Sequence, residues 1–230
     1  MSSEMLTADQ AKFENIRVMG EELGSVYDAL WQQMAWLHRK WSEYVVLFGT
    51  KKSRVDLLNE TAPVFTRIVQ DALWEDVLLH IARLTDPPKS AGKHNLTIQY
   101  LAQIVTHADT KVTVEILTKE TLLATEFCRD WRNRHIAHRD LHLALKREAE
   151  PLKSASREKV NDALKALAAV MNAVAMHYRS STTFFDFDVA AGGAMSLLYA
   201  LDDGLNVERS RNERQRNGHF DPNEYRPYDL

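Results

Sequence analysis

The stretch from Cys128 to His142 concentrates side chains that can do chemistry on a phosphate. Between Arg129 and Arg147 there are six Lys or Arg residues, three His and only two acids, in a chain whose formal net charge is -3. An arginine is a permanent cation with a planar donor fork that suits phosphate, and a histidine exchanges a proton near neutral pH without a metal. Arg132 and His138 together therefore predict a site that holds and cleaves a phosphodiester.

The spacing of this pair restricts how it can work. Arg132 and His138 are six residues apart, so in a continuous α-helix they point about 120° away from each other. One unbroken helix does not bring them together. Either the helix begins or bends between them, or the site combines residues from two copies of the chain at a two-fold interface.

RNA fits this pair of residue types because it carries its own nucleophile, the 2'-OH, which DNA lacks. One histidine takes the proton of that hydroxyl, and a second protonates the leaving 5'-oxygen. The arginine stabilises the charge that builds on the phosphate. The products are a 2',3'-cyclic phosphate and a 5'-OH, and no metal or other cofactor is required.

Other kinds of site fit this stretch less well. His135, His138 and His142 lie within about 60° of one another on an ideal helix, but the only acid among them, Asp140, is on another face, so no metal site is predicted. Cys128 would need a histidine within reach and a third orienting group, and burial is predicted for it instead. A solvated, salt-bridged helix face stays open as an alternative, although two acids do not neutralise six cations.

Composition sets the broad class of protein. With 230 residues and 45% hydrophobic content, the chain can bury one good core. The small net charge excludes a general nucleic-acid binder, so an anionic partner must meet a local patch. The single cysteine and the lack of a leader or an apolar run of ~20 residues predict a cytoplasmic protein outside any membrane.

Eight glycines and six prolines are few, and helix-forming residues abound, so we expect an all-α fold. The break over 86–95, with two prolines and a glycine, predicts a mobile surface loop. Apolar spacing predicts helices over 13–48 (one, or two joined near Gly24), over 63–85, and over 97–106, where Thr97 is the cap. It also predicts a helix that starts at Lys111 or Thr118 and runs into the central stretch. Two more helices are predicted over 160–178, after a cap at Ser154 or Ser156, and over 190–207.

Two further expectations concern the organisation of the chain. We expect residues 1–183 to form the helical bundle, and residues 184–230 to form a C-terminal helix and tail that pack on the same domain. Asp76 and Arg83 are seven residues apart with His80 in phase, which predicts an ion pair at the edge of the core. Such a pair usually serves the scaffold alone, and the alternative, to which we assign Asp76 and Arg83, is a role in supporting the site.

Two blocks of the sequence resemble a known family. Arg132-Asn133-Arg134-His135-Ile136-Ala137-His138-Arg139-Asp140 is similar to the HEPN motif, an Arg followed by a polar residue and, four to six residues further on, a His. The block from Leu73 to Pro87, with Leu96-Thr97-Ile98 after it, resembles the AbiU-type abortive-infection HEPN proteins. The resemblance implies an HEPN-like bundle of four to five helices with an additional C-terminal helix or arm. It also implies a homodimer that cleaves RNA without a metal, in phage defence, abortive infection or a toxin–antitoxin system with an antitoxin protein as partner.

The resemblance also implies roles for single residues. Arg132 would bind and polarise the phosphate, Asn133 would position it, and His138 would transfer the proton. We assign the neighbouring residues to RNA binding (Arg134, His135 and Arg139) and two residues upstream to support (Asp76 and Arg83). The alternative function is a non-catalytic HEPN-like module that binds RNA or nucleotides or mediates an interaction.

The motif fits the sequence in two registers, because Arg129-Asp130 and His135 repeat the spacing of Arg132-Asn133 and His138. The context Ile136-Ala137-His138 favours the second register. Position 140 is Asp where one HEPN subgroup has a tyrosine that a partner nucleotidyltransferase modifies, so that form of control is not expected.

Overall fold

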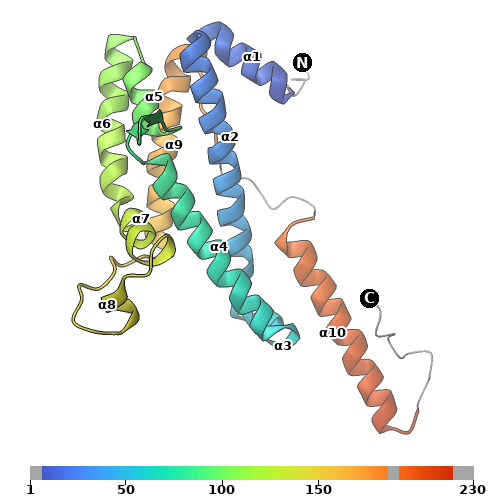
Figure 1. Cartoon of the computed structure of the whole chain (residues 1–230). Coiled ribbons are helices and arrows are strands. Elements are labelled where there is room, and N and C mark those ends of the chain that lie inside the picture. The colour runs from blue at the N-terminus through green and yellow to red at the C-terminus, as the bar shows by residue number, and fades with distance from the viewer. Residues whose placement is uncertain (1–6, 186–191, 220–230) are drawn as a thin grey trace. The chain divides into compact units, whose positions relative to one another are not determined.

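The structure is a computed structural model, and it describes residues 7–185 and 192–219. In these residues the regular secondary structure is helical apart from one short hairpin, which confirms the all-α class (Figure 1). The elements are α1 (Ala8–Met19), α2 (Glu21–Tyr44), the π-helical turn η1 (Val45–Gly49), α3 (Lys52–Thr61), α4 (Pro63–Leu84), β1 (Lys89–Ser90), β2 (Lys93–His94), α5 (Ile98–Ile104), α6 (Ala108–Ala124), α7 (Glu126–Trp131), the π-helical turn η2 (Arg132–Ile136), α8 (Leu141–Ala144), α9 (Arg157–Arg179) and α10 (Ala194–Arg216). None of these helices is both long and apolar enough to span a bilayer.

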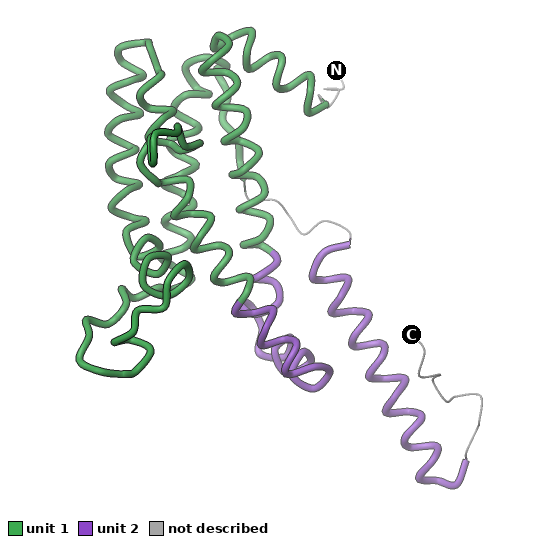
Figure 2. The backbone as a smooth tube through the Cα atoms, in the orientation of Figure 1, with its two compact units in different colours: residues 1–42, 72–187 green, residues 43–71, 188–230 purple. Residues whose placement is uncertain are grey.

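The chain divides into two compact units, residues 1–42 with 72–187 and residues 43–71 with 188–230 (Figure 2). In the first unit α6 packs along α9, and α5 packs against both. The side chains with no exposed surface include Leu30, Met34, Leu37, Leu78, Ile81, Ile98, Leu101, Leu167 and Met171, from α2, α4, α5 and α9. This unit carries the residues of the candidate site, whereas the bundle predicted over 1–183 also included residues 43–71, which belong to the second unit.

The spacing of the buried residues of α2 explains why this segment is helical. Its buried side chains step alternately by three and four residues: Tyr27, Leu30, Met34, Leu37 and Trp41. That spacing places them along one side of an α-helix. Trp36 falls outside this series and is exposed, so the tryptophans spread around the helix as predicted.

The joint between α1 and α2 lies at Gly20, four residues before the predicted position. Gly20 has φ +85°, a left-handed backbone that glycine adopts without a steric penalty. Gly24 remains helical, and a Cβ atom there would lie 2.5 Å from the Cα of Ile16. Gly24 therefore lets the two helices approach closely, while Gly20 makes the turn.

The second unit consists of η1, α3 and α10 with the flanking ends of α2 and α4. α10 packs against α3 and η1. At its N-terminus the amide of Ala194 donates to Glu43 Oε2 at 2.5 Å, and further along Arg209 pairs with Glu60 at 2.7 Å. α10 continues nine residues beyond the predicted end at Val207, because its polar Glu and Arg residues are good helix formers although they lack apolar periodicity.

The segment predicted as a loop over 86–95 contains a small antiparallel hairpin. Lys89 pairs with His94 and Ser90 with Lys93. Ala91 and Gly92 both have positive φ, 47° and 80°, as the two central residues of a type I′ turn require. The segment is exposed at the surface, as predicted, and its mobility stays a prediction. The strand pairing was missed because these strands have only two residues each.

Candidate active site

The Arg-to-His stretch begins within a helix and ends outside it. α7 follows α6 after Thr125, and the chain then winds through η2, where the Ala137 amide donates to the Arg132 carbonyl at 2.8 Å. A turn closed over five residues is wider than an α-turn and occurs often at functional sites. The helix therefore changes its winding between Arg132 and His138, which is one of the two possibilities that the spacing left open. No hydrogen bond joins these two side chains in the described part of the chain.

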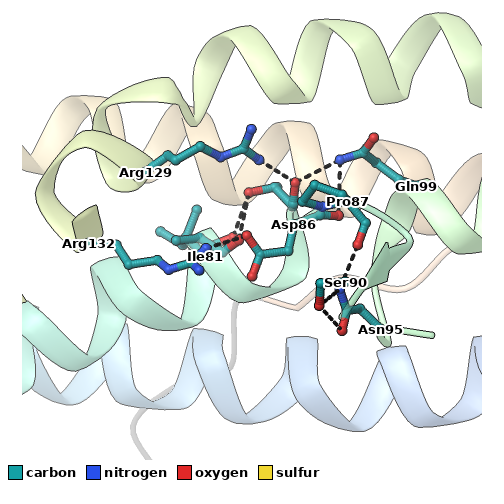
Figure 3. Close-up of polar contacts among 10 residues, drawn as sticks. Ile81, Asp86, Pro87, Ser90, Asn95, Gln99, Arg129 and Arg132 are labelled. Atoms are coloured by element: carbon teal, nitrogen blue, oxygen red, sulfur yellow. Dashed lines mark hydrogen bonds and ion pairs between the residues drawn. The ribbon is translucent and has the colours of Figure 1, made fainter. Parts of the chain in front are cut away.

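Arg132 is held by a carboxylate from another part of the sequence. Its Nη1 donates to Oδ1 of Asp86, which is the second residue after the end of α4 (Figure 3). The Arg132 side chain is 32% exposed and that of Asp86 is 20% exposed. The guanidinium is thus fixed at the edge of the bundle, where solvent still reaches it.

The main chain at this end of α4 is held from two directions. Arg129 Nη2 donates to the Thr85 carbonyl at 2.5 Å, and Gln99 Nε2 of α5 donates to the carbonyls of Thr85 and Asp86 at 2.9 and 3.0 Å (Figure 3). The last carbonyls of an α-helix have no partner within the helix and need one elsewhere. Arg129 and Gln99 supply it, and they fix the position of Asp86.

These contacts distinguish the two registers of the motif. In the first register Arg129 binds a main-chain carbonyl, and His135 lies 3.3 Å from Glu75 Oε1 with its ring against Trp131. In the second register Arg132 faces a side-chain carboxylate and His138 is exposed. The arrangement favours the Arg132 and His138 register for contact with a substrate.

Arg134 lies at the centre of a set of contacts that hold the following loop, residues 137–156. Its Nη2 donates to the Glu150 carbonyl at 2.5 Å, and its guanidinium lies 3.4 Å from Asp130 and 3.5 Å from Asp140. Asp130 also accepts from the Lys153 amide at 2.8 Å. The structure therefore uses Arg134 inside the chain, and the predicted contact of Arg134 with RNA stays a prediction.

Three other predicted site residues, Asn133, His138 and Arg139, are exposed. Asp140 begins the short helix α8 by accepting from the amides of His142 and Leu143 at 2.9 and 3.1 Å. The hydrogen bond from Leu143 is the main cause that lowers the pKa of Asp140. The loop that carries His138 is therefore capped by an ionised carboxylate two residues further on.

The predicted support residues are placed differently from expectation. Asp76 lies 2.5 Å from Lys40 Nζ of α2, and Arg83 is exposed. Residues seven apart are about 10 Å apart along a helix, which is too far for an ion pair, so a partner on the neighbouring helix takes the place of Arg83. Lys40 Nζ also lies 3.3 Å from His80 Nδ1. Lys40, Asp76 and His80 form a polar cluster between α2 and α4.

His80 makes stability depend on pH. Burial, and after it the Lys40 ammonium, lowers the pKa of His80 to about 4, whereas an unfolded histidine titrates at about 6.5. Between these pH values the histidine is protonated in the unfolded state but neutral in the folded state. The contribution of His80 to the free energy of unfolding is therefore fully present above pH 6.5 and is lost as the pH falls toward 4. We expect His80 to account for a loss of roughly 2–3 kcal/mol in the free energy of unfolding over this window.

Urea unfolding at several pH values measures this effect. His80→Gln should flatten the pH dependence in the acid window, because glutamine keeps an acceptor for Lys40 but does not titrate. His142→Gln, at an exposed histidine, should keep the wild-type slope. Equal slopes for His80→Gln and wild type would contradict the expectation.

Cys128 is buried with no exposed surface, as predicted, and burial raises the pKa of its thiol. A thiol that stays protonated is a poor nucleophile and a poor metal ligand. In residues 7–185 and 192–219, no three His, Cys, Asp or Glu side chains converge as the ligands of a metal ion would.

Sequence reasoning missed the residues that hold the Arg-to-His stretch in place. Asp86, which contacts Arg132, was expected only at the start of a loop, and Gln99 and Glu75 were given no role. The signal for them was their position in the block from Leu73 to Pro87 and in the helix after Thr97, which fold against the Arg-to-His stretch.

The chain matches the family model HEPN_AbiU2, described as AbiU2, over residues 20–191. This range covers three quarters of the chain and includes both the end of α4 and the Arg-to-His stretch. No curated protein and no solved structure matches the sequence.

Proposed function

The chain belongs to the AbiU2 family of HEPN proteins, and from this premise we propose that it is a metal-independent endoribonuclease. The observation that carries the proposal is the placement of Arg132 and His138. The guanidinium is fixed by Asp86 at a partly exposed position, and the imidazole is exposed just beyond the π-helical turn. A fixed cation and an accessible proton carrier are what RNA cleavage through the 2'-OH needs.

In the proposed reaction, His138 of one copy takes the proton of the 2'-OH, and the 2'-oxygen attacks the phosphorus. The bond to the 5'-oxygen breaks, and His138 of the second copy gives its proton to that oxygen. Arg132 stabilises the added charge on the phosphate, and Asn133 positions it. Arg139, exposed beside His138, contacts the RNA backbone. The products are a 2',3'-cyclic phosphate and a 5'-OH, so all atoms and protons are accounted for.

The two-copy site requires a homodimer, and a surface suited to one lies beside His138. Leu141 and Leu145 are 61% and 50% exposed. Leu141 begins α8 and Leu145 caps its C-terminal end, one turn later, so the two side chains lie on the same side of this turn. Exposed large apolar side chains grouped in this way are typical of protein contacts. We infer that a second copy covers this pair and brings the two His138 side chains to one seam.

The biological setting follows from the family. We propose that the protein acts on RNA in the cytoplasm as a toxin in phage defence by abortive infection or in a toxin–antitoxin system, and that an antitoxin protein restrains it.

The test uses purified protein, single-stranded RNA and EDTA. We expect cleavage that EDTA does not inhibit, products that end in a 2',3'-cyclic phosphate and a 5'-OH, and no cleavage of DNA of the same sequence. Light scattering at micromolar concentration should give the mass of a dimer. EDTA-sensitive cleavage or a monomer would refute this mechanism. Equal tolerance of overexpressed wild type and His138→Ala in growing cells would instead support the non-catalytic RNA-binding or interaction module.

A further inference from the structure

We propose that Asp86 is a positioning residue that fixes Arg132 so that one edge of its guanidinium faces the phosphate. This inference rests on the proposed function and extends it, from the contact that holds Arg132 to the direction in which Arg132 meets the phosphate. Asp86 comes from the end of α4 and Arg132 from η2, so the contact joins segments 46 residues apart in the sequence.

The geometry of the contact leaves a binding edge open. Asp86 engages Nη1 only, and in the part of the chain that the structure describes, Nε and Nη2 of Arg132 make no hydrogen bond. Those two nitrogens form one side of the planar fork, and their parallel N–H groups suit two oxygens of a phosphate. The carboxylate on Nη1 therefore selects this side for the phosphate.

Asp86 can fix Arg132 because Asp86 is itself held firmly. The two carbonyls around it accept from Arg129 and Gln99, and Leu84 and Thr85 just before it are buried. On the other side Asn95 Nδ2 donates to the Pro87 carbonyl at 2.8 Å (Figure 3). A carboxylate on such a segment keeps its place when the substrate arrives, which is the preorganisation that catalysis by fixed charges requires.

The same carboxylate opposes binding of the substrate. A negative charge beside the phosphate site repels the RNA backbone, while the orientation of Arg132 helps only when charge builds on the phosphate in the transition state. Neutralising Asp86 should therefore move binding and turnover in opposite directions. A residue that served only to stabilise the fold would not produce this split, because its loss would weaken binding and turnover together with the melting temperature.

The experiment compares wild type with Asp86→Asn. We expect the single-turnover cleavage rate to fall about 10- to 100-fold, as for other misplaced catalytic groups. We expect the dissociation constant for a 2'-O-methyl RNA, which has no free 2'-OH, to decrease about 3- to 10-fold through loss of the repulsion. Asp71→Asn is the matched control, since Asp71 is another carboxylate of α4 paired with an arginine, Arg67, at 2.9 Å. It should change neither value.

Each outcome decides the inference. Cleavage by Asp86→Asn at or above the wild-type rate overturns it, and so does weaker binding of the 2'-O-methyl RNA.

If Asp86→Asn does not fold, Asp86→Glu takes its place; it keeps the charge and moves the carboxylate by one methylene. Slower cleavage with unchanged binding is then the expected result, and unchanged cleavage overturns the inference. If the wild type cleaves no RNA, the proposed function fails, and tighter binding by Asp86→Asn alone still supports Asp86 as the charge beside the phosphate site.

Discussion

Substitution of His138 with alanine should reduce RNA cleavage in EDTA by about 10²- to 10⁴-fold, the range that general acid–base catalysis supplies. The loss is expected because His138 is proposed to act twice in each reaction, once as base and once as acid from the second copy. The side chain is exposed, so its removal leaves no cavity, and the melting temperature should not change. Single-turnover cleavage of a labelled RNA measures the effect.

His142→Ala is the matched control for this prediction. His142 is an exposed histidine on the same loop, and its hydrogen bonds come from the main chain: the amide donates to Asp140, and the carbonyl accepts from the Arg147 amide. We expect this variant to cleave within a few-fold of wild type. Equal losses in both variants would mean that the loop as a whole matters, and not the proton transfer by His138.

Replacement of Arg132 is the second large expected effect. Arg132→Lys should lose about 10²- to 10³-fold in cleavage, comparable with the loss of one donor to a developing oxyanion. Lysine keeps the charge but is a point donor without the planar fork, so it cannot bind Asp86 and a phosphate in fixed directions at the same time. The rate constant should fall more than the affinity for RNA, as measured by single-turnover cleavage beside fluorescence anisotropy.

The comparison with Arg129→Lys tests which register of the motif works. Arg129 donates to the Thr85 carbonyl, which a lysine ammonium can also do. We therefore expect Arg129→Lys to keep most of the cleavage activity and to lower the melting temperature slightly. A larger loss of cleavage in Arg129→Lys than in Arg132→Lys would show that the first register carries the chemistry.

Much of the fold follows from local sequence signals. Thr97 accepts from the Tyr100 amide and begins α5, Ser156 accepts from the Lys159 amide and begins α9, and Pro63 is the first residue of α4. Each signal acts within one turn of the chain, so the sequence alone contains it. The joint at Gly20 was harder to predict, because sequence does not tell a glycine that turns the chain from a glycine that lets two helices approach.

The contacts of the candidate site could not be predicted in the same way. Asp86, the partner of Arg132, lies in the turn after α4, and Lys40, the partner of Asp76, lies on α2. Helical periodicity indicates which face a residue occupies but not which other segment meets that face. The motif residues could be chosen from their chemistry. What holds them could be found only once the end of α4 was placed beside η2.

The π-helical turn at Arg132–Ile136 has a consequence for the evolution of the family. A π-turn takes up one residue more than an α-turn of similar rise. A relative that lacks one residue between its arginine and its histidine can wind the same segment as a regular α-turn and lose little of the rest of the fold. The interval between the two residues can thus change in length by insertion or deletion, while the carboxylate at the end of α4 stays where it is.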